Sequence, residues 1–124
     1  MKSVTALLCD DSAHSRGMLK TVLGQYGIEH VFEVSNGEDL LKRLASTRVD
    51  LILLDINMPE MSGLETLQRI RESGNDVYVV IISGNADAES VRTAVSLGAR
   101  GYVVKPFTTS KVFSALDGFK ATRQ

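Results

Sequence analysis

Two adjacent carboxylates, Asp10 and Asp11, stand directly after the apolar run LLC. Asp55 follows a second apolar run, LILL, while Ser83 and Lys105 follow two more runs further along the chain. Carboxylates that gather within a few ångströms repel one another, and a divalent cation relieves that repulsion. Oxygen ligands without thiolate or imidazole favour Mg²⁺, which also binds phosphate oxygens. These residue types therefore predict a magnesium site that handles a phosphoryl group, if the fold brings them together.

Asp55 is the candidate for covalent chemistry. The loop that follows it, INMPEMSG, contains Pro59 and Gly63 and can hold a fixed geometry. A carboxylate can accept a phosphoryl group and form an aspartyl phosphate, for which the protein supplies mostly positioning and charge neutralisation. In this interpretation Mg²⁺ and Lys105 neutralise the phosphoryl oxygens, and the Ser83 hydroxyl donates a hydrogen bond to one of them.

Each of these residues also has an ordinary structural explanation. Adjacent aspartates are commonly a helix N-cap beside a solvated neighbour, and Asp11 or Ser12 could cap the following helix. Asp55 alone fits a turn, Ser83 a structural hydroxyl, and Lys105 a surface lysine. The chemical interpretation depends on all of them reaching one edge of the fold.

Five short apolar runs alternate with amphipathic segments along the chain. The runs predict strands over residues 4–9, 30–34, 50–55, 77–82 and 101–105. The segments between and after them predict helices over residues 15–26, 38–46, 63–73, 88–98 and 108–124. This alternation indicates parallel strands with right-handed helical crossovers, in a three-layer α/β sandwich. In such sheets the functional crevice lies outside the carboxyl ends of the strands, where the candidate residues fall.

Apolar residues at helical spacing are expected to face the core. These stripes include Met18 in the first helix and Val95 in the fourth. Gly27 follows the first of these helices as a C-terminal cap, and the fourth is expected to stop at Gly98.

Composition excludes several classes of function. A chain of 124 residues with 44% hydrophobic residues predicts one domain, residues 1–124. A formal net charge of -1 provides no bulk field for nucleic acid or an anionic membrane. The single cysteine, Cys9, excludes an internal disulfide and is interpreted as a small core residue. No apolar segment approaches the length of a membrane span. We therefore expect a soluble, cytoplasmic protein.

Four segments together resemble one protein family. LLCDDSAHSR, LILLDINMPEMSGLE, IISGNAD and GARGYVVKPF are similar to the receiver domain of bacterial two-component response regulators, most closely the stand-alone CheY type. The likeness covers nearly the whole chain, with the motifs in the family's order and spacing. It implies a flavodoxin-like, doubly wound sheet of five parallel strands in the order 2-1-3-4-5.

The resemblance also implies roles for the acidic residues. Asp55 matches the carboxylate that accepts a phosphoryl group from a histidine kinase or phosphotransfer protein, and it contributes to the metal site. Asp11 matches the direct Mg²⁺ ligand, and Asp10 the ligand that acts largely through water. The backbone carbonyl of Asn57 matches a further ligand.

A second group of residues matches the family's switch. Ser83 corresponds to the hydroxyl residue that moves toward the phosphate, and Tyr102 to the aromatic residue that then turns inward. Lys105 corresponds to the family's lysine, whose bond to Pro106 is usually cis. An unidentified output partner is expected to read the change on the face formed by the fourth helix, fifth strand and fifth helix. The chain is expected to be a monomer or weak dimer.

Four other polar residues receive ordinary interpretations. Arg16 and Glu65 match positions typical of the family, and we interpret both as solvated or helix-pairing charges. His14 and His30 are too few and too isolated for a metal site or a relay.

The leading hypothesis is a phosphorylation-dependent signalling switch that catalyses only its own phosphoryl transfer and dephosphorylation. A receiver fragment of a larger regulator is an alternative, because the sequence stops at FKATRQ, where a linker to an output domain could begin. A Mg²⁺-dependent aspartyl phosphatase resembling the haloacid dehalogenases is less favoured, because DDS departs from the D-x-D spacing of that class. A binding module without phosphorylation is the remaining hypothesis.

Overall fold

Strands and helices alternate through residues 3–123, which the computed structural model describes. In chain order the elements are β1 (Thr5–Cys9), α1 (Ala13–Tyr26), β2 (His30–Val34), α2 (Gly37–Ser46), β3 (Leu51–Leu54), α3 (Gly63–Glu72), β4 (Tyr78–Ser83), α4 (Ala88–Ser96), β5 (Gly101–Val104) and α5 (Thr109–Ala121). Every predicted element is present. Two bounds matter for the site: Ser83 is the last residue of β4, and α1 begins at Ala13 because Ser12 caps it.

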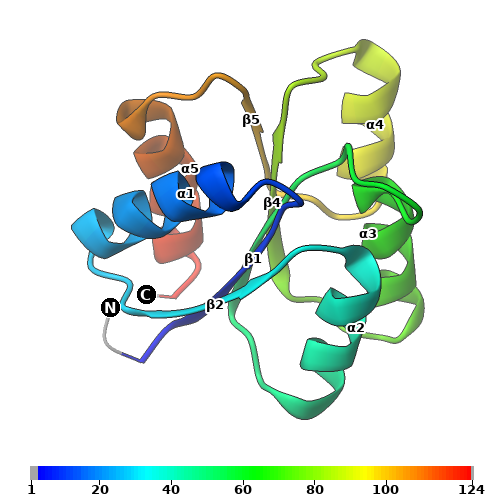
Figure 1. Cartoon of the computed structure of the whole chain (residues 1–124), viewed down its shortest axis with the longest axis horizontal. Helices are drawn as coiled ribbons and strands as arrows, with labels where there is room; N and C mark the ends of the chain where they lie inside the picture. Colours follow the sequence, from blue (N-terminus) through cyan, green and yellow to red (C-terminus); the bar gives the residue numbers. More distant parts are fainter. Residues whose placement is uncertain (1–2, 124) are drawn as a thin grey trace.

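All five strands are parallel and lie in the order β2-β1-β3-β4-β5. The predicted fold class is therefore confirmed. In the register of the sheet, Cys9 lies opposite Leu54 of β3, and Leu54 lies opposite Ile81 of β4. The central strands consequently end at nearly the same level, and the residues after them share one edge of the sheet (Figure 1).

Helices cover both faces of the sheet and form a three-layer sandwich. α1 and α5 pack on one face, while α2, α3 and α4 pack on the other (Figure 1). Successive strand residues point to opposite faces, so that in β1 Ala6 and Leu8 join one core cluster, and Leu7 and Cys9 join the other. Full burial of a side chain such as Leu8 stabilises the fold by roughly 2 kcal/mol.

Two residues predicted to face the core are instead exposed. The side chain of Met18 on α1 is 44% exposed, and that of Val95 on α4 is 61% exposed. The buried stripe is narrower than predicted, since α1 buries only Leu19, Val22 and Leu23. On α4 the stripe is reduced to Ala94, which is the helix's one buried residue.

The predicted helix ends are confirmed at two glycines. Gly27 has a φ of 100° and Gly98 a φ of 81°. An L-residue with a side chain pays a steric penalty at such angles, whereas glycine does not. Both glycines therefore allow the chain to turn sharply from a helix into the next strand.

Cys9 is a buried core residue, as predicted. Burial, followed by the negative charges of Asp10 and Asp55, raises the pKa of its thiol to about 12. The thiol therefore stays protonated, and its sulfur lies 3.6 Å from the Met58 Sδ atom.

Within residues 3–123, no helix combines the length and apolar character that crossing a bilayer requires.

Candidate functional site

The acidic pair lies where β1 ends at the carboxyl edge of the sheet. Asp10 is buried, and its backbone N–H donates to the Val34 carbonyl at 3.2 Å, which extends the pairing with β2 by one residue. Its Oδ1 atom accepts the backbone N–H of Ser12 at 2.9 Å. Asp11 is exposed. The two neighbours therefore differ: Asp10 is fixed within the fold, whereas Asp11 faces solvent.

Asp55 follows β3 and is also buried. Its backbone N–H donates to the Cys9 carbonyl at 2.9 Å, and its Oδ1 atom accepts the N–H of Asn57 at 3.2 Å. The loop closes through a 2.8 Å bond from the Gly63 N–H to the Ile56 carbonyl. A Cβ atom on Gly63 would lie only 2.1 Å from the Asp55 carbonyl oxygen, so glycine is required for this close approach.

The three carboxylates converge as the sequence predicted. Asp10, Asp11 and Asp55 each offer an oxygen, and these atoms lie within 4.8 Å of one another. Burial raises the pKa of Asp55, and the negative charges of Asp10 and Asp11 add to this increase, whereas Lys105 and the Asn57 N–H oppose it. A hard cation would remove the repulsion between the three groups, and three carboxylate oxygens suit Mg²⁺. The donor set therefore fits the predicted metal.

Lys105 reaches the same cluster from the end of β5. Its Nζ atom lies 2.7 Å from Asp10 Oδ2 and 3.7 Å from Asp55 Oδ2. The Lys105–Pro106 peptide bond is cis, and the backbone N–H of Lys105 donates to the Ser83 carbonyl at 2.8 Å. The ammonium group is therefore shared between two carboxylates and lies closer to Asp10 than to the candidate acceptor.

Ser83 is fully buried and begins a chain of hydrogen bonds toward α4. Its Oγ atom accepts the Asn85 N–H at 3.0 Å, and the Asn85 side chain accepts the Asp87 N–H at 3.0 Å. Asp87 is the N-cap of α4. The Tyr102 hydroxyl donates to the Asn85 carbonyl. The two residues that match the family's switch are thus connected through the backbone of Asn85.

A hollow of about 380 Å³ borders the acidic cluster. Asp11 lies on its wall, together with Asn36 at the start of α2 and Pro59 in the loop after β3. This hollow gives the exposed side of the cluster an approach from solvent.

Arg16 is a site residue that the sequence analysis misjudged. Its Nη1 atom donates to the Asp10 carbonyl at 2.7 Å, and its Nε atom pairs with Glu33 Oε1 at 3.2 Å. It is therefore neither solvated nor paired within its own helix. Its position six residues after Asp10, in the first turn of α1, was the available signal. Glu65, by contrast, does form a helix pair with Arg69, at 3.9 Å.

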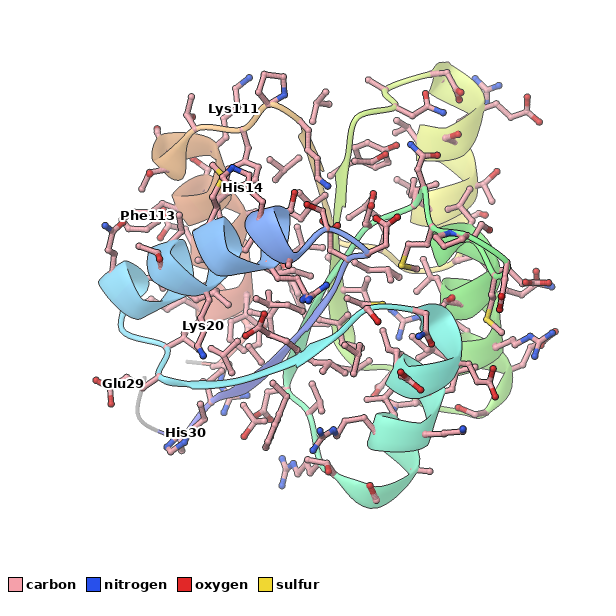
Figure 2. All side chains as sticks on the ribbon, viewed as in Figure 1. His14, Lys20, Glu29, His30, Lys111 and Phe113 are labelled. Atoms are coloured by element: carbon pink, nitrogen blue, oxygen red, sulfur yellow. The ribbon has the colours of Figure 1, made fainter. Side chains whose placement is uncertain are left out.

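The two histidines lie apart from each other. Figure 2 shows His14 on α1 and His30 at the beginning of β2, well separated from each other. The two imidazole groups therefore do not meet in the fold.

Comparison with known proteins places this arrangement in a family. The sequence profile described as "Response regulator receiver domain" matches residues 6–117. The chemotaxis protein CheY of Thermotoga maritima is 32% identical over 111 residues, which cover 90% of this chain and 92% of the relative. CheY of Listeria monocytogenes is 34% identical over 111 residues, covering 90% of this chain and 93% of that protein.

Solved structures agree with this result. The chemotaxis protein CheY4 of Vibrio cholerae superposes with a TM-score of 0.85 at 26% identity, over 94% of this chain and 98% of that one. The BeF3-activated receiver domain of DrrB gives a TM-score of 0.84 at 26% identity, over 98% and 99% of the two chains. The chain therefore belongs to the response regulator receiver domain family of two-component signalling, and it is CheY-like.

Proposed function

We propose that this receiver domain is a phosphorylation-dependent switch in which Asp55 accepts the phosphoryl group. The environment of Asp55 carries the proposal: a buried carboxylate lies beside two further carboxylates, with an ammonium group 3.7 Å away. Burial raises the pKa of Asp55, and the negative charges of Asp10 and Asp11 add to the increase, so a cation bound beside Asp55 would favour the ionised carboxylate that acts as the nucleophile.

In the proposed reaction, a carboxylate oxygen of Asp55 attacks the phosphorus atom of a phosphohistidine on a histidine kinase or phosphotransfer protein. The P–N bond breaks, and its electron pair remains on the imidazole nitrogen. Lys105 neutralises charge on the phosphoryl oxygens as the group arrives. Asp10, Asp11, Asp55 and the Asn57 carbonyl would hold Mg²⁺, which supplies further charge neutralisation when it is bound. Water later attacks the phosphorus, the P–O bond to Asp55 breaks, and inorganic phosphate leaves as the Asp55 carboxylate is restored.

The signal leaves the site through Ser83. On phosphorylation, the Ser83 hydroxyl turns to a phosphoryl oxygen, and the Asn85 N–H loses its acceptor. Asn85 joins Ser83 to the half-buried Tyr102, so loss of this contact frees the loop before α4, and phosphorylation shifts the population between two arrangements of α4 and β5. An output partner reads this shift on the face formed by α4, β5 and α5.

We further propose that residues 1–124 act as one cytoplasmic receiver domain, either alone or within a larger regulator. In this proposal the domain catalyses only its own phosphorylation and dephosphorylation, because the reacting carboxylate belongs to the domain itself. The likeness to other receiver domains supports the proposed histidine kinase and output partner by analogy.

The intact mass of the protein after incubation with phosphoramidate tests the acceptor directly. The wild type and the Asp55→Asn variant are each incubated with Mg²⁺ or with EDTA. We expect one added phosphoryl group on the wild type, only with Mg²⁺, and none on the variant. An unmodified wild type, or equal modification of both proteins, would leave an unphosphorylated binding module as the better assignment.

A further inference from the structure

Arg16 contacts Asp10, one of the proposed Mg²⁺ ligands, but its guanidinium group is not itself a metal ligand. Its guanidinium group is held between two elements, because Nη1 donates to the Asp10 carbonyl at 2.7 Å and Nε pairs with Glu33 on β2 at 3.2 Å. Its side chain is 19% exposed. A planar guanidinium that is held at both ends has little freedom to turn, so its N–H groups keep a fixed direction.

The carbonyl that Arg16 binds belongs to the peptide that joins Asp10 to Asp11. Because the peptide is planar, the direction of this carbonyl also fixes the orientation of the N–H and Cα atoms of Asp11. β1 ends at Cys9, whose carbonyl accepts the Asp55 N–H. The Asp10 carbonyl lies one residue beyond this ladder in a buried position, where a backbone oxygen requires a partner. Arg16 supplies that partner.

We propose that Arg16 is a positioning residue of the metal site. It fixes the Asp10–Asp11 peptide, and through it the mutual orientation of the two carboxylates, while Glu33 holds the guanidinium in place. The inference rests on the proposed function, because it assigns these carboxylates to Mg²⁺. Groups that orient metal ligands from outside the coordination sphere commonly change metal affinity by about 10- to 100-fold.

Positioning and simple electrostatics predict opposite results for Arg16→Gln. The substitution removes a positive charge beside a cluster of carboxylates, and this change alone strengthens the attraction for a cation. The loss of the bond to the Asp10 carbonyl releases the peptide and weakens Mg²⁺ binding. The sign of the change in affinity therefore distinguishes the two effects.

Lys20→Gln is the matched control. Lys20 also lies on α1 (Figure 2) and its Nζ atom lies 3.7 Å from Glu33 Oε2, so it shares the anion that holds Arg16. Its substitution removes the same charge and leaves the bond to Asp10 intact. Arg16→Lys is the conservative variant, because it keeps the charge but cannot hold Asp10 and Glu33 together with one rigid fork.

Titration of the metal-free proteins with Mg²⁺, followed by ¹⁵N NMR, gives the four dissociation constants. We expect the constant to rise by about 10- to 100-fold in Arg16→Gln, by less in Arg16→Lys, and by under about twofold in Lys20→Gln. An Arg16→Gln variant that binds Mg²⁺ as tightly as the wild type, or more tightly, would overturn the proposal.

Amide exchange in EDTA provides a readout without metal. The Ser12 N–H donates to Asp10 Oδ1, and it should exchange several-fold faster in Arg16→Gln while Lys20→Gln leaves it unchanged. Equal acceleration in every strand would indicate lost global stability and would contradict a positioning role. If the wild type binds no Mg²⁺, the proposed function fails, while the exchange of Ser12 still decides whether Arg16 holds Asp10.

Discussion

The two halves of the carboxyl edge are held in place differently. On the β1 side, every polar group of Asp10 has a partner: its N–H, its carbonyl and both carboxylate oxygens are bonded, and Lys105 and Arg16 supply two of these bonds. On the β4 side, the side chains of Ser83, Asn85 and Asp87 each accept one backbone N–H along the loop that leads into α4. The half that holds the proposed metal ligands is therefore preorganised, whereas the half proposed to carry the signal is held by fewer contacts.

The helices next to these two halves show the same difference. α1 buries Leu19, Val22 and Leu23, whereas α4 buries only Ala94. The carboxyl end of α4 is nevertheless held, because Arg71 of α3 donates to backbone carbonyls at that end. The amino end of α4, which is connected to Ser83, is consequently the freer end. Elements with few buried contacts open at lower free energy, and moving parts are drawn from them.

Truncation of one apolar residue on each helix gives the largest expected contrast. Leu23 on α1 is fully buried, and we expect Leu23→Ala to lower the free energy of unfolding by about 3 kcal/mol. Val95 on α4 is 61% exposed, so Val95→Ala should change it by under about 0.5 kcal/mol. Urea denaturation measures both, and a comparable loss in the two variants would remove the difference between the helices.

Two glycine substitutions test the packing around the acceptor. We expect Gly63→Ala to cost about 2 kcal/mol, because its Cβ atom would collide with the Asp55 carbonyl, and to reduce phosphorylation by phosphoramidate. Gly17 on α1 has no atom within 4 Å of its Cβ position, so Gly17→Ala should stabilise the fold by about 0.5–1 kcal/mol. Thermal unfolding and intact mass measure the two effects, and a stable, fully active Gly63→Ala variant would contradict the described loop.

The charge on Asp55 predicts a smaller, pH-dependent effect. Burial raises the pKa of Asp55, so the folded protein keeps this proton at a pH where the unfolded chain releases it. The ionised carboxylate therefore destabilises the fold above its folded pKa, and the cost disappears below the unfolded value of about 3.9. In EDTA, Asp55→Asn should be more stable than the wild type at pH 7, and the difference should shrink as the pH falls toward 4. A difference that grows on acidification would give the pKa shift the opposite sign.

Tyr102 provides the smallest test, on the signalling side. Tyr102→Phe removes the hydroxyl that donates to the Asn85 carbonyl, and the net loss should be about 0.5–1 kcal/mol. Because the contact fixes the loop before α4, faster amide exchange should be confined to residues 84–90. Faster exchange in β1 and α1 instead would mean that the two halves are not held independently.

The patterns in the sequence predicted the alternation of strands and helices and most of the candidate site for one physical reason, whereas the strand order was implied by the family resemblance. Short apolar runs and period-3.6 patterns predict the order of strands and helices along the chain, and parallel strands bring their carboxyl ends to one edge. Asp10, Asp55 and Lys105 could therefore be placed together from their positions after strands.

Features set by the packing distance of the elements could not be predicted in this way. Periodicity gives the phase of a helix but not how closely it lies against the sheet, which is why Met18 and Val95 were wrongly assigned to the core. The contacts of Arg16 and Arg71 depend on where a long side chain meets a backbone carbonyl of another segment. No pattern along the sequence predicts such a contact between a side chain and a distant backbone carbonyl.

The central claim is that Asp55 controls α4 while the proposed metal ligands after β1 stay fixed. Hydrogen exchange with and without a bound phosphoryl mimic tests this claim most directly. The wild type and Asp55→Asn are compared in Mg²⁺ alone and in Mg²⁺ with beryllofluoride. We predict altered exchange at residues 84–91 and in β5 of the wild type, little change in α1, and no response in Asp55→Asn. A response centred on α1, or an equal response in the variant, would contradict the account.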